Sequence, residues 1–263
     1  MVKCFCKLYT NITTGAYMIR LILVVVFVVL FLIVSIPILL VEWIIGKFNM
    51  NLKKRSSLAI VAWAFRVVSF LSGTKITVIG KENVPVDQPV LYIGNHRSYF
   101  DVVVSYALVP NLTGYIAKKQ ILKVPVLGQW MKNLDCLFLD RDDLRQGMEV
   151  ILEAIEKIRN GISICIYPEG TRNNTDQALL PFKKGSFKIA QRTGCALIPV
   201  TINNTRDIFE SHPWYIRPQH VIIEYGTPIY YSKLEKEDQK NIHETVQAII
   251  EKTYLKNNDL IQK

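Results

Sequence analysis

The chain has 263 residues, half of which are hydrophobic, and it carries a formal net charge of +10. This length is sufficient for one α/β domain with a short appendage and a sizeable core. The positive charge favours an anionic partner, and because the sequence contains no recognisable nucleic-acid-binding module, an anionic membrane surface or a phosphate-bearing lipid is the better candidate.

The amino-terminal segment, residues 1–72, is predicted to hold the chain at a membrane. Leu21 to Val41 contains no charged residue, and a helix of this length, rising ~1.5 Å per residue, can cover the ~30 Å hydrocarbon core of a bilayer. A secretory signal peptide would have an apolar region of only about 7–15 residues followed by a cleavage site, whereas Glu42 and Trp43 follow here. We therefore expect a retained anchor.

A second apolar segment, Leu58 to Leu71, contains Arg66 and follows a basic cluster. It fits an interfacial helix that lies in the headgroup region and pairs with the first helix as a hairpin. It also fits a helix that packs on the soluble core. Basic residues flank both ends of the first apolar segment, so the positive-inside rule does not choose its orientation.

Residues 73–263 are predicted to form one α/β domain with a mostly parallel central sheet flanked by helices, because short apolar strands alternate with helical patterns. The expected strands are Lys75 to Gly80, Val90 to Gly94, Gly114 to Ala117, Cys136 to Leu139, Ile162 to Tyr167, Leu197 to Ile202 and Val221 to Tyr225. One helix is expected from Val102 to Leu108. Two others are expected to face the core through apolar stripes: Leu144, Met148, Ile151, Ile155 and Ile158, then Ile242, Val246, Ile249 and Ile250.

A histidine and an aspartate follow the strand Val90 to Gly94 within the motif Asn95 to Asp101. A neutral imidazole such as that of His96 can take a proton from a hydroxyl, and a carboxylate behind it can hold the ring in the required tautomer. The segment Ser98 to Asp101 also fits a helix capping box, in which the carboxylate merely faces backbone amides. Both interpretations remain open at this point.

Charged residues also follow two further strands. Pro168 to Arg172 forms a tight turn that contains Glu169 and Arg172, and Phe138 lies in a strand that ends at Asp140 and Arg141. The carboxyl ends of parallel strands meet at one edge of a sheet, so we expect these groups to lie near His96. The competing interpretation of the turn is a polar loop with a weak surface ion pair.

Together these blocks resemble the 1-acylglycerol-3-phosphate acyltransferases, which are the lysophosphatidate acyltransferases of phospholipid synthesis. That family carries a histidine and an aspartate separated by four residues, matched by His96 and Asp101, and a Pro-Glu-Gly-Thr-Arg block, matched by Pro168 to Arg172. It also carries a phenylalanine-containing strand ending in arginine and an apolar strand with proline, matched here by Leu197 to Val200. The resemblance departs at Asp135, where the family usually has glycine.

The resemblance implies transfer of a fatty acyl group from an acyl thioester to the sn-2 hydroxyl of 1-acylglycerol-3-phosphate, giving phosphatidic acid. His96 is expected to be the general base, supported by Asp101, and backbone amides near Gly170 are candidates for stabilising the developing oxyanion. The residues expected to bind substrate are Arg141, Glu169, Gly170, Thr171, Arg172, Lys118 and Lys183. For the two lysines, an exposed surface position is an equally good interpretation.

No cofactor and no metal site are expected, since metal-binding spacings are absent from the sequence. Acyl-coenzyme A or an acylated carrier protein serves as co-substrate, and membrane lipid and lysophosphatidate are the other expected partners. Cys136, Cys165 and Cys195 are expected to be buried free thiols in a reducing compartment, and the catalytic domain is expected to face the cytoplasm from a membrane. The alternatives are an acyltransferase acting on glycerol-3-phosphate or another lysophospholipid, and a non-catalytic membrane protein that binds anionic lipid.

Overall fold

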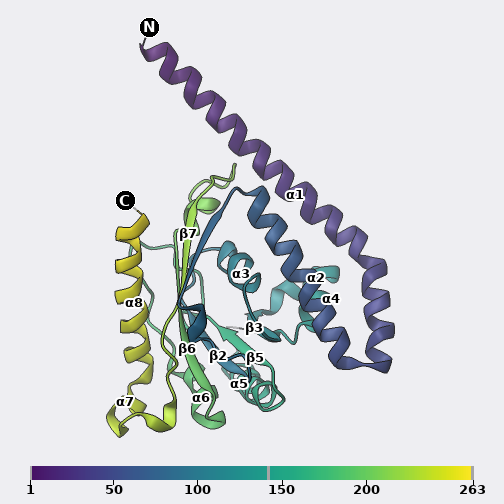
Figure 1. The fold of residues 1–263 in the computed structure, drawn as a ribbon, viewed down its shortest axis with the longest axis vertical. Coiled ribbons are helices and arrows are strands. Elements are labelled where there is room, and N and C mark those ends of the chain that lie inside the picture. The colour runs from purple at the N-terminus through teal and green to yellow at the C-terminus, as the bar shows by residue number, and fades with distance from the viewer. Residues whose placement is uncertain (1, 141–142, 262–263) are drawn as a thin grey trace.

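The computed structural model describes residues 2–140 and 143–261 (Figure 1). Two long helices, α1 (Val2–Phe48) and α2 (Met50–Leu71), form a hairpin beside an α/β domain. Asn49 makes the turn between them, because its side chain accepts a hydrogen bond from the amide of Leu52 at 2.9 Å and so caps α2. Farther along the hairpin, the buried Glu42 accepts a hydrogen bond from Ser56 at 2.9 Å.

A seven-stranded sheet forms the centre of the domain, with strand order β1-β7-β6-β2-β5-β3-β4. Only β6 and β7 pair antiparallel, and the other five pairings are parallel. All seven predicted strands are present, within one residue of their predicted ends. Their bounds are β1 (Lys75–Ile79), β2 (Val90–Gly94), β3 (Thr113–Lys118), β4 (Leu137–Leu139), β5 (Ser163–Ile166), β6 (Ala196–Asn203) and β7 (His220–Tyr225).

Helices cover both faces of the sheet, and the alternation of side chains along β2 separates the two cores. Val90 and Tyr92 pack into the cluster on the side of α2, α3 and α4, whereas Leu91 and Ile93 pack into the cluster on the side of α5, α6 and α8. Figure 1 shows α8 on one side of the sheet and the α1–α2 hairpin on the other. The bounds of these helices are α3 (Tyr99–Tyr106), α4 (Pro125–Asn133), α5 (Leu144–Arg159), α6 (Lys188–Thr193), α7 (Lys236–Lys240) and α8 (Ile242–Ile261).

Three details of the predicted helices were wrong. Ile249 of α8, which was predicted to face the core, is 37% exposed. The helix predicted from Val102 begins at Tyr99, because Ser98 caps it. In α5 the side chain of Met148 is 66% exposed, whereas Ala154 is fully buried. The face of α5 that meets the sheet is centred near Ala154, because a small side chain permits close approach. The helix is therefore rotated about its axis relative to the predicted orientation, and Met148 faces solvent.

Helix α1 presents an apolar face away from the domain. Its segment Thr14–Phe48 is long and apolar enough to cross a membrane, and it is the one helix in the described part of the chain that passes this test of length and composition. From Tyr17 onward it also contacts the domain, whereas its amino-terminal end projects away from it. Trp130 of α4 donates a hydrogen bond to Ser35 at 3.0 Å, and the amide of Ile216 donates to the carbonyl of Tyr17 at 3.2 Å.

Helix α2 combines the two arrangements that its sequence left open. It pairs with α1 as a hairpin, and it also buries Val61, Ala64 and Val68 in the core of the domain. Its end near the turn is held by Lys54, which forms an ion pair with Asp135 at 2.9 Å.

Asp135 stands where the resembled family usually has glycine, and the structure explains how it fits. Its backbone φ is +57°, in the left-handed region that glycine favours and that aspartate tolerates better than most residues. Its carboxylate pairs with Lys157 of α5 at 2.7 Å as well as with Lys54 of α2. The side chain therefore joins helices on the two faces of the sheet, which a glycine cannot do.

Candidate active site

The residues of the candidate site follow the carboxyl ends of three strands. β2 leads into His96, β5 leads into Tyr167 and Glu169, and β6 leads into Thr205. Because β2 pairs in parallel with both β5 and β6, these residues emerge at one edge of the sheet. The turn after β2 is fixed by the buried Asn95, whose side-chain amide donates to the carbonyl of Ile202 and accepts from its amide, both at 2.8 Å.

Asp101 is fully buried and accepts hydrogen bonds from four groups. The amides of Arg97 and Ser98 donate to it at 2.6 and 2.8 Å, and the hydroxyl of Thr205 donates at 2.5 Å. Nδ1 of His96 lies 2.8 Å from the same carboxylate. The side chain of Ser98 also accepts from an amide of α3, which completes a capping box. The two interpretations of this motif are therefore compatible, because one carboxylate caps the helix and holds the imidazole.

The contacts of His96 determine which ring nitrogen is available to accept a proton. With Nδ1 donating to Asp101, Nε2 is the nitrogen that can accept a proton. The ring lies flat against that of Tyr167, with 4.3 Å between centroids and 10° between planes. Its backbone is held as well, since its amide donates to Glu169 at 2.6 Å and its carbonyl accepts from the amide of Asn173 at 2.7 Å. The imidazole is thus held on several sides while 14% of the side chain stays exposed.

Glu169 lies behind the histidine. One of its oxygens accepts from the amide of His96, and the other accepts from the amide of Leu180 at 2.9 Å. Burial raises the pKa of Glu169 to about 7, although the two amide donors and the nearby His96 favour the charged form. This placement gives the side chain a role in holding the backbone of the site, and its expected contact with substrate stays a prediction.

The contribution of Glu169 to the stability of the protein is expected to be lost as the pH rises from about 4.5 to about 7. Its carboxyl titrates at about 7 in the folded protein and at about 4.5 when unperturbed, so between these values the folded state binds more protons than the unfolded state. The difference corresponds to roughly 3 kcal/mol. Urea unfolding of the wild type and Glu169→Gln from pH 5 to 8 measures this dependence, which the variant should lack. A stability difference between the two proteins that stays constant with pH would contradict the assignment.

Arg172 reaches the start of α3, where it packs on Tyr99. Its guanidinium carbon lies 3.8 Å from the centroid of the Tyr99 ring. Its guanidinium nitrogens contact the Tyr99 hydroxyl at 3.1 Å and the carboxylate of Glu210 at 3.3 Å. Glu210 also accepts from the Ser98 hydroxyl and the Tyr99 amide, both at 2.7 Å. The sequence motifs gave no indication of Glu210, which lies in the connection between β6 and β7.

The remaining predicted site residues do not share one environment. Gly170 has a φ of +72°, and its amide donates to the carbonyl of Tyr167 at 3.0 Å, so this amide is not free to stabilise an oxyanion as expected. Lys183 packs against Gly170, where an added Cβ would lie 2.7 Å from Nζ. Thr171 is exposed, and so is Lys118 at the end of β3. Arg141 lies outside the described residues.

The three predicted buried thiols are present as free cysteines at Cys136, Cys165 and Cys195. Burial raises the pKa of Cys136 and of Cys165 to about 12. Both are therefore protonated at neutral pH and are poor nucleophiles.

Comparison with known proteins identifies relatives of this chain. The acyltransferase family model matches residues 75–203. The 1-acyl-sn-glycerol-3-phosphate acyltransferase of Borreliella burgdorferi is 30% identical over 188 residues, which are 72% of this chain and 75% of that protein. The enzyme of the same name from Haemophilus influenzae is 31% identical over 206 residues, or 76% of this chain and 82% of that protein. The coconut enzyme of that name is 31% identical over 185 residues, but these are only 59% of its length.

A solved structure shares the fold over nearly the whole chain. The crystal structure of the 1-acyl-sn-glycerophosphate acyltransferase PlsC from Thermotoga maritima superposes with a TM-score of 0.75. The match has 21% sequence identity and covers 91% of this chain and 97% of that chain. The chain therefore belongs to the acyltransferase family that includes the 1-acyl-sn-glycerol-3-phosphate acyltransferases.

Proposed function

We propose that this protein transfers a fatty acyl group from an acyl thioester to the sn-2 hydroxyl of 1-acylglycerol-3-phosphate, which yields phosphatidic acid. The main support for the proposal is the contact between His96 and Asp101 at the carboxyl edge of the sheet. Lipid binding alone would not need a carboxylate-supported imidazole with one nitrogen facing outward. The names of the relatives favour lysophosphatidate over other acceptors.

The acyl group would pass directly from the thioester to the acceptor hydroxyl, without an enzyme nucleophile. Nε2 of His96 takes the proton of the acceptor hydroxyl while the hydroxyl oxygen forms a bond to the thioester carbon. The carbon–sulfur bond breaks, and the imidazolium returns the proton to the departing thiolate. Asp101 stabilises the imidazolium in between. Base catalysis of this kind typically contributes about 10²–10⁴-fold in rate.

The acceptor phosphate needs cations at a distance from the reacting hydroxyl. Arg172 lies next to the histidine motif and offers a planar fork suited to a phosphate. Lys183, which packs against Gly170, adds a second positive charge to this side of the site. We assign these two residues to the phosphate, with Arg141 and Lys118 as further candidates and Glu169, Gly170 and Thr171 as the wall of the pocket.

We assign the membrane anchor to residues 1–72 and the catalytic domain to residues 73–263. The outward face of α1 exposes large apolar side chains along the helix, among them Ile19, Ile33 and Trp43. Burial of such a face in lipid is favourable, and the same lipid would supply the acceptor and receive the product. The free cysteines fit a domain that faces a reducing compartment such as the cytoplasm.

An assay with the purified full-length chain in phospholipid vesicles tests the proposal. The vesicles contain lysophosphatidate, and the donor is either acyl-coenzyme A or acylated carrier protein, with phosphatidic acid detected by mass spectrometry. Parallel samples contain glycerol-3-phosphate, lysophosphatidylcholine or no acceptor. Preferential acylation of another acceptor would replace the proposed substrate. Donor consumption without acylation would indicate a hydrolase, and no consumption of either donor would indicate a lipid-binding protein.

Arg172→Ala is expected to weaken acceptor binding while leaving donor binding unchanged. Loss of a charged hydrogen-bonding partner costs about 1.5–3 kcal/mol, so the KM for lysophosphatidate should rise roughly 10- to 100-fold. Arg192→Ala is the matched control, because Arg192 is exposed on α6 at the opposite edge of the sheet. An unchanged KM for lysophosphatidate in Arg172→Ala would remove this residue from the phosphate site.

A further inference from the structure

Tyr167 forms a flat support beneath the imidazole of His96, and the strand register explains how. In the parallel pairing of β2 with β5, Ile93 lies opposite Ile166, so Gly94 and Tyr167 are the next residues along the two strands. Gly94 has no side chain, which leaves room for the aromatic ring. A Cβ added to Gly94 would lie 3.0 Å from Cε1 of Tyr167. The chain then turns, and the imidazole comes to rest on the face of Tyr167.

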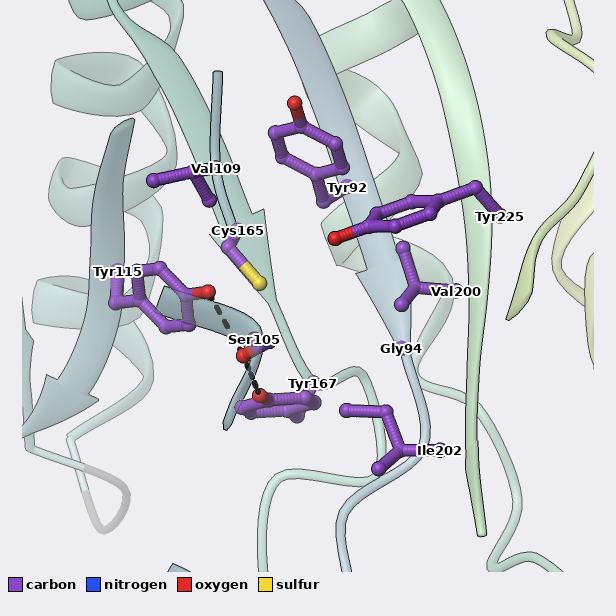
Figure 2. A pocket seen from close by; sticks show the side chains of 10 residues that line it. All are labelled: Tyr92, Gly94, Ser105, Val109, Tyr115, Cys165, Tyr167, Val200, Ile202 and Tyr225. Atoms are coloured by element: carbon purple, nitrogen blue, oxygen red, sulfur yellow. Dashed lines mark hydrogen bonds between the residues drawn. The ribbon is translucent and has the colours of Figure 1, made fainter. Parts of the chain in front are cut away.

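Neighbouring hydroxyl groups contact Tyr167 in turn. Figure 2 shows its hydroxyl beside that of Ser105, which in turn meets the hydroxyl of Tyr115, at distances of 3.5 and 2.9 Å. The Ser105 hydroxyl also donates to the carbonyl of Asp101. The cavity under this cluster is only about 10 Å³, which is room for one water molecule at most. Little empty space therefore lies beside the Tyr167 ring on this side.

The hydrogen bond from His96 to Asp101 does not fix the imidazole by itself. The contact between Nδ1 and the carboxylate positions one ring atom, but small rotations about the Cα–Cβ and Cβ–Cγ bonds still change the direction of Nε2. Contact with a flat aromatic face removes that freedom. The same face carries negative charge density, so it also favours the imidazolium that forms during proton transfer.

We propose that Tyr167 is a positioning residue, which fixes the plane of His96 so that Nε2 points at the acceptor hydroxyl. The inference rests on the acyl transfer proposed above. It predicts that the aromatic ring of Tyr167 supplies most of the effect, because its hydroxyl makes only a 3.5 Å contact with Ser105. Small displacements of a catalytic group cost up to about 10²-fold in rate, so Tyr167→Leu is expected to lower kcat roughly 10- to 100-fold with the KM of both substrates unchanged. Tyr167→Phe is expected to retain the wild-type kcat.

A matched control separates positioning from a general loss of packing. Tyr92 is buried in the same cluster and lines the same cavity, but its ring does not stack on His96. Tyr92→Leu should lower the melting temperature about as much as Tyr167→Leu while leaving kcat close to the wild-type value. An equal loss of kcat in both variants would mean that the tyrosines act only through stability, and would overturn the proposal.

Gly94 provides an independent test of the same contact. Gly94→Ala pushes a Cβ against the Tyr167 ring, so it should lower kcat in the wild-type background. In the Tyr167→Leu background the added methyl group meets a flexible side chain and should have little further effect. Additive effects of the two substitutions would contradict an action through one contact.

The position of the imidazole can also be read without turnover. A ring proton that lies over an aromatic face is shielded, so the Cε1 proton of His96 should give an upfield NMR signal in the wild type and in Tyr167→Phe. The signal should move downfield in Tyr167→Leu. A wild type that fails to acylate lysophosphatidate would reject the proposed function, whereas an active wild type with an equally active Tyr167→Leu would reject this inference. An unchanged His96 signal in Tyr167→Leu would reject it in either case.

Discussion

His96→Ala is expected to abolish acyl transfer while the fold and the membrane association stay intact. The variant lacks the group that accepts the hydroxyl proton, so at least the 10²–10⁴-fold contribution typical of a general base, about 3–5 kcal/mol of barrier, should disappear. Asp101 keeps its bonds from Arg97, Ser98 and Thr205, so its buried carboxylate is still satisfied. The initial rate of phosphatidic acid formation, the melting temperature and co-sedimentation with vesicles measure the three properties.

His243→Ala is the appropriate control for this prediction. His243 lies at the start of α8, on the far side of the sheet from the α1–α2 hairpin, and packs against Phe187. It should retain the wild-type rate. A fully active His96→Ala protein would remove the imidazole from the mechanism and, with it, the main support for the proposed reaction.

Asp101→Ala is expected to lose stability as well as activity, which distinguishes it from His96→Ala. The carboxylate is buried and serves two backbone amides, a hydroxyl and the imidazole at once. Its removal leaves the amides of Arg97 and Ser98 without an acceptor, at about 1–3 kcal/mol each, and removes a helix cap worth about 1 kcal/mol. We expect a loss of about 3–7 kcal/mol in the free energy of unfolding, together with a kcat at least as low as that of His96→Ala.

Urea unfolding and turnover of the same preparation test this second prediction. Thr205→Val is a graded companion, because it removes one of the four hydrogen bonds to Asp101 while keeping the size of the side chain. Its loss of stability should be smaller, and its turnover should be reduced but measurable. Wild-type stability in Asp101→Ala would contradict the hydrogen-bond pattern around the carboxylate.

The strands were predictable because each is a short apolar run bounded by residues that break regular structure. Their order was not, since no local pattern states that β1 pairs with β7 at one edge or that β7 runs antiparallel to β6. The orientation of α5 about its own axis was also not predictable from the sequence. A count of large apolar residues selects Met148, whereas the packed face is centred on Ala154, whose small size makes it a weak signal in a hydrophobic pattern.

Part of the candidate site could be predicted for a related reason. His96 and Asp101 lie five positions apart, so one turn and the first residues of a helix bring them together. Thr205 and Glu210 contact the same motif from more than 100 residues away, and they are ordinary residue types in an irregular connection. Tyr167 had a usable signal, since it directly precedes the Pro168 to Arg172 turn and follows a strand that was predicted to be parallel to the one before His96.

The contacts of α1 determine how this protein can be dissected. Val24 is part of the hydrophobic core, and Trp130 is buried with its indole nitrogen bonded to Ser35. Tyr17 holds Ile216, in the same connection that carries Glu210 to the catalytic motif. A fragment that begins after this helix would lose part of its hydrophobic core and the contact that holds the loop carrying Glu210. Deleting α1 would therefore yield an unstable fragment.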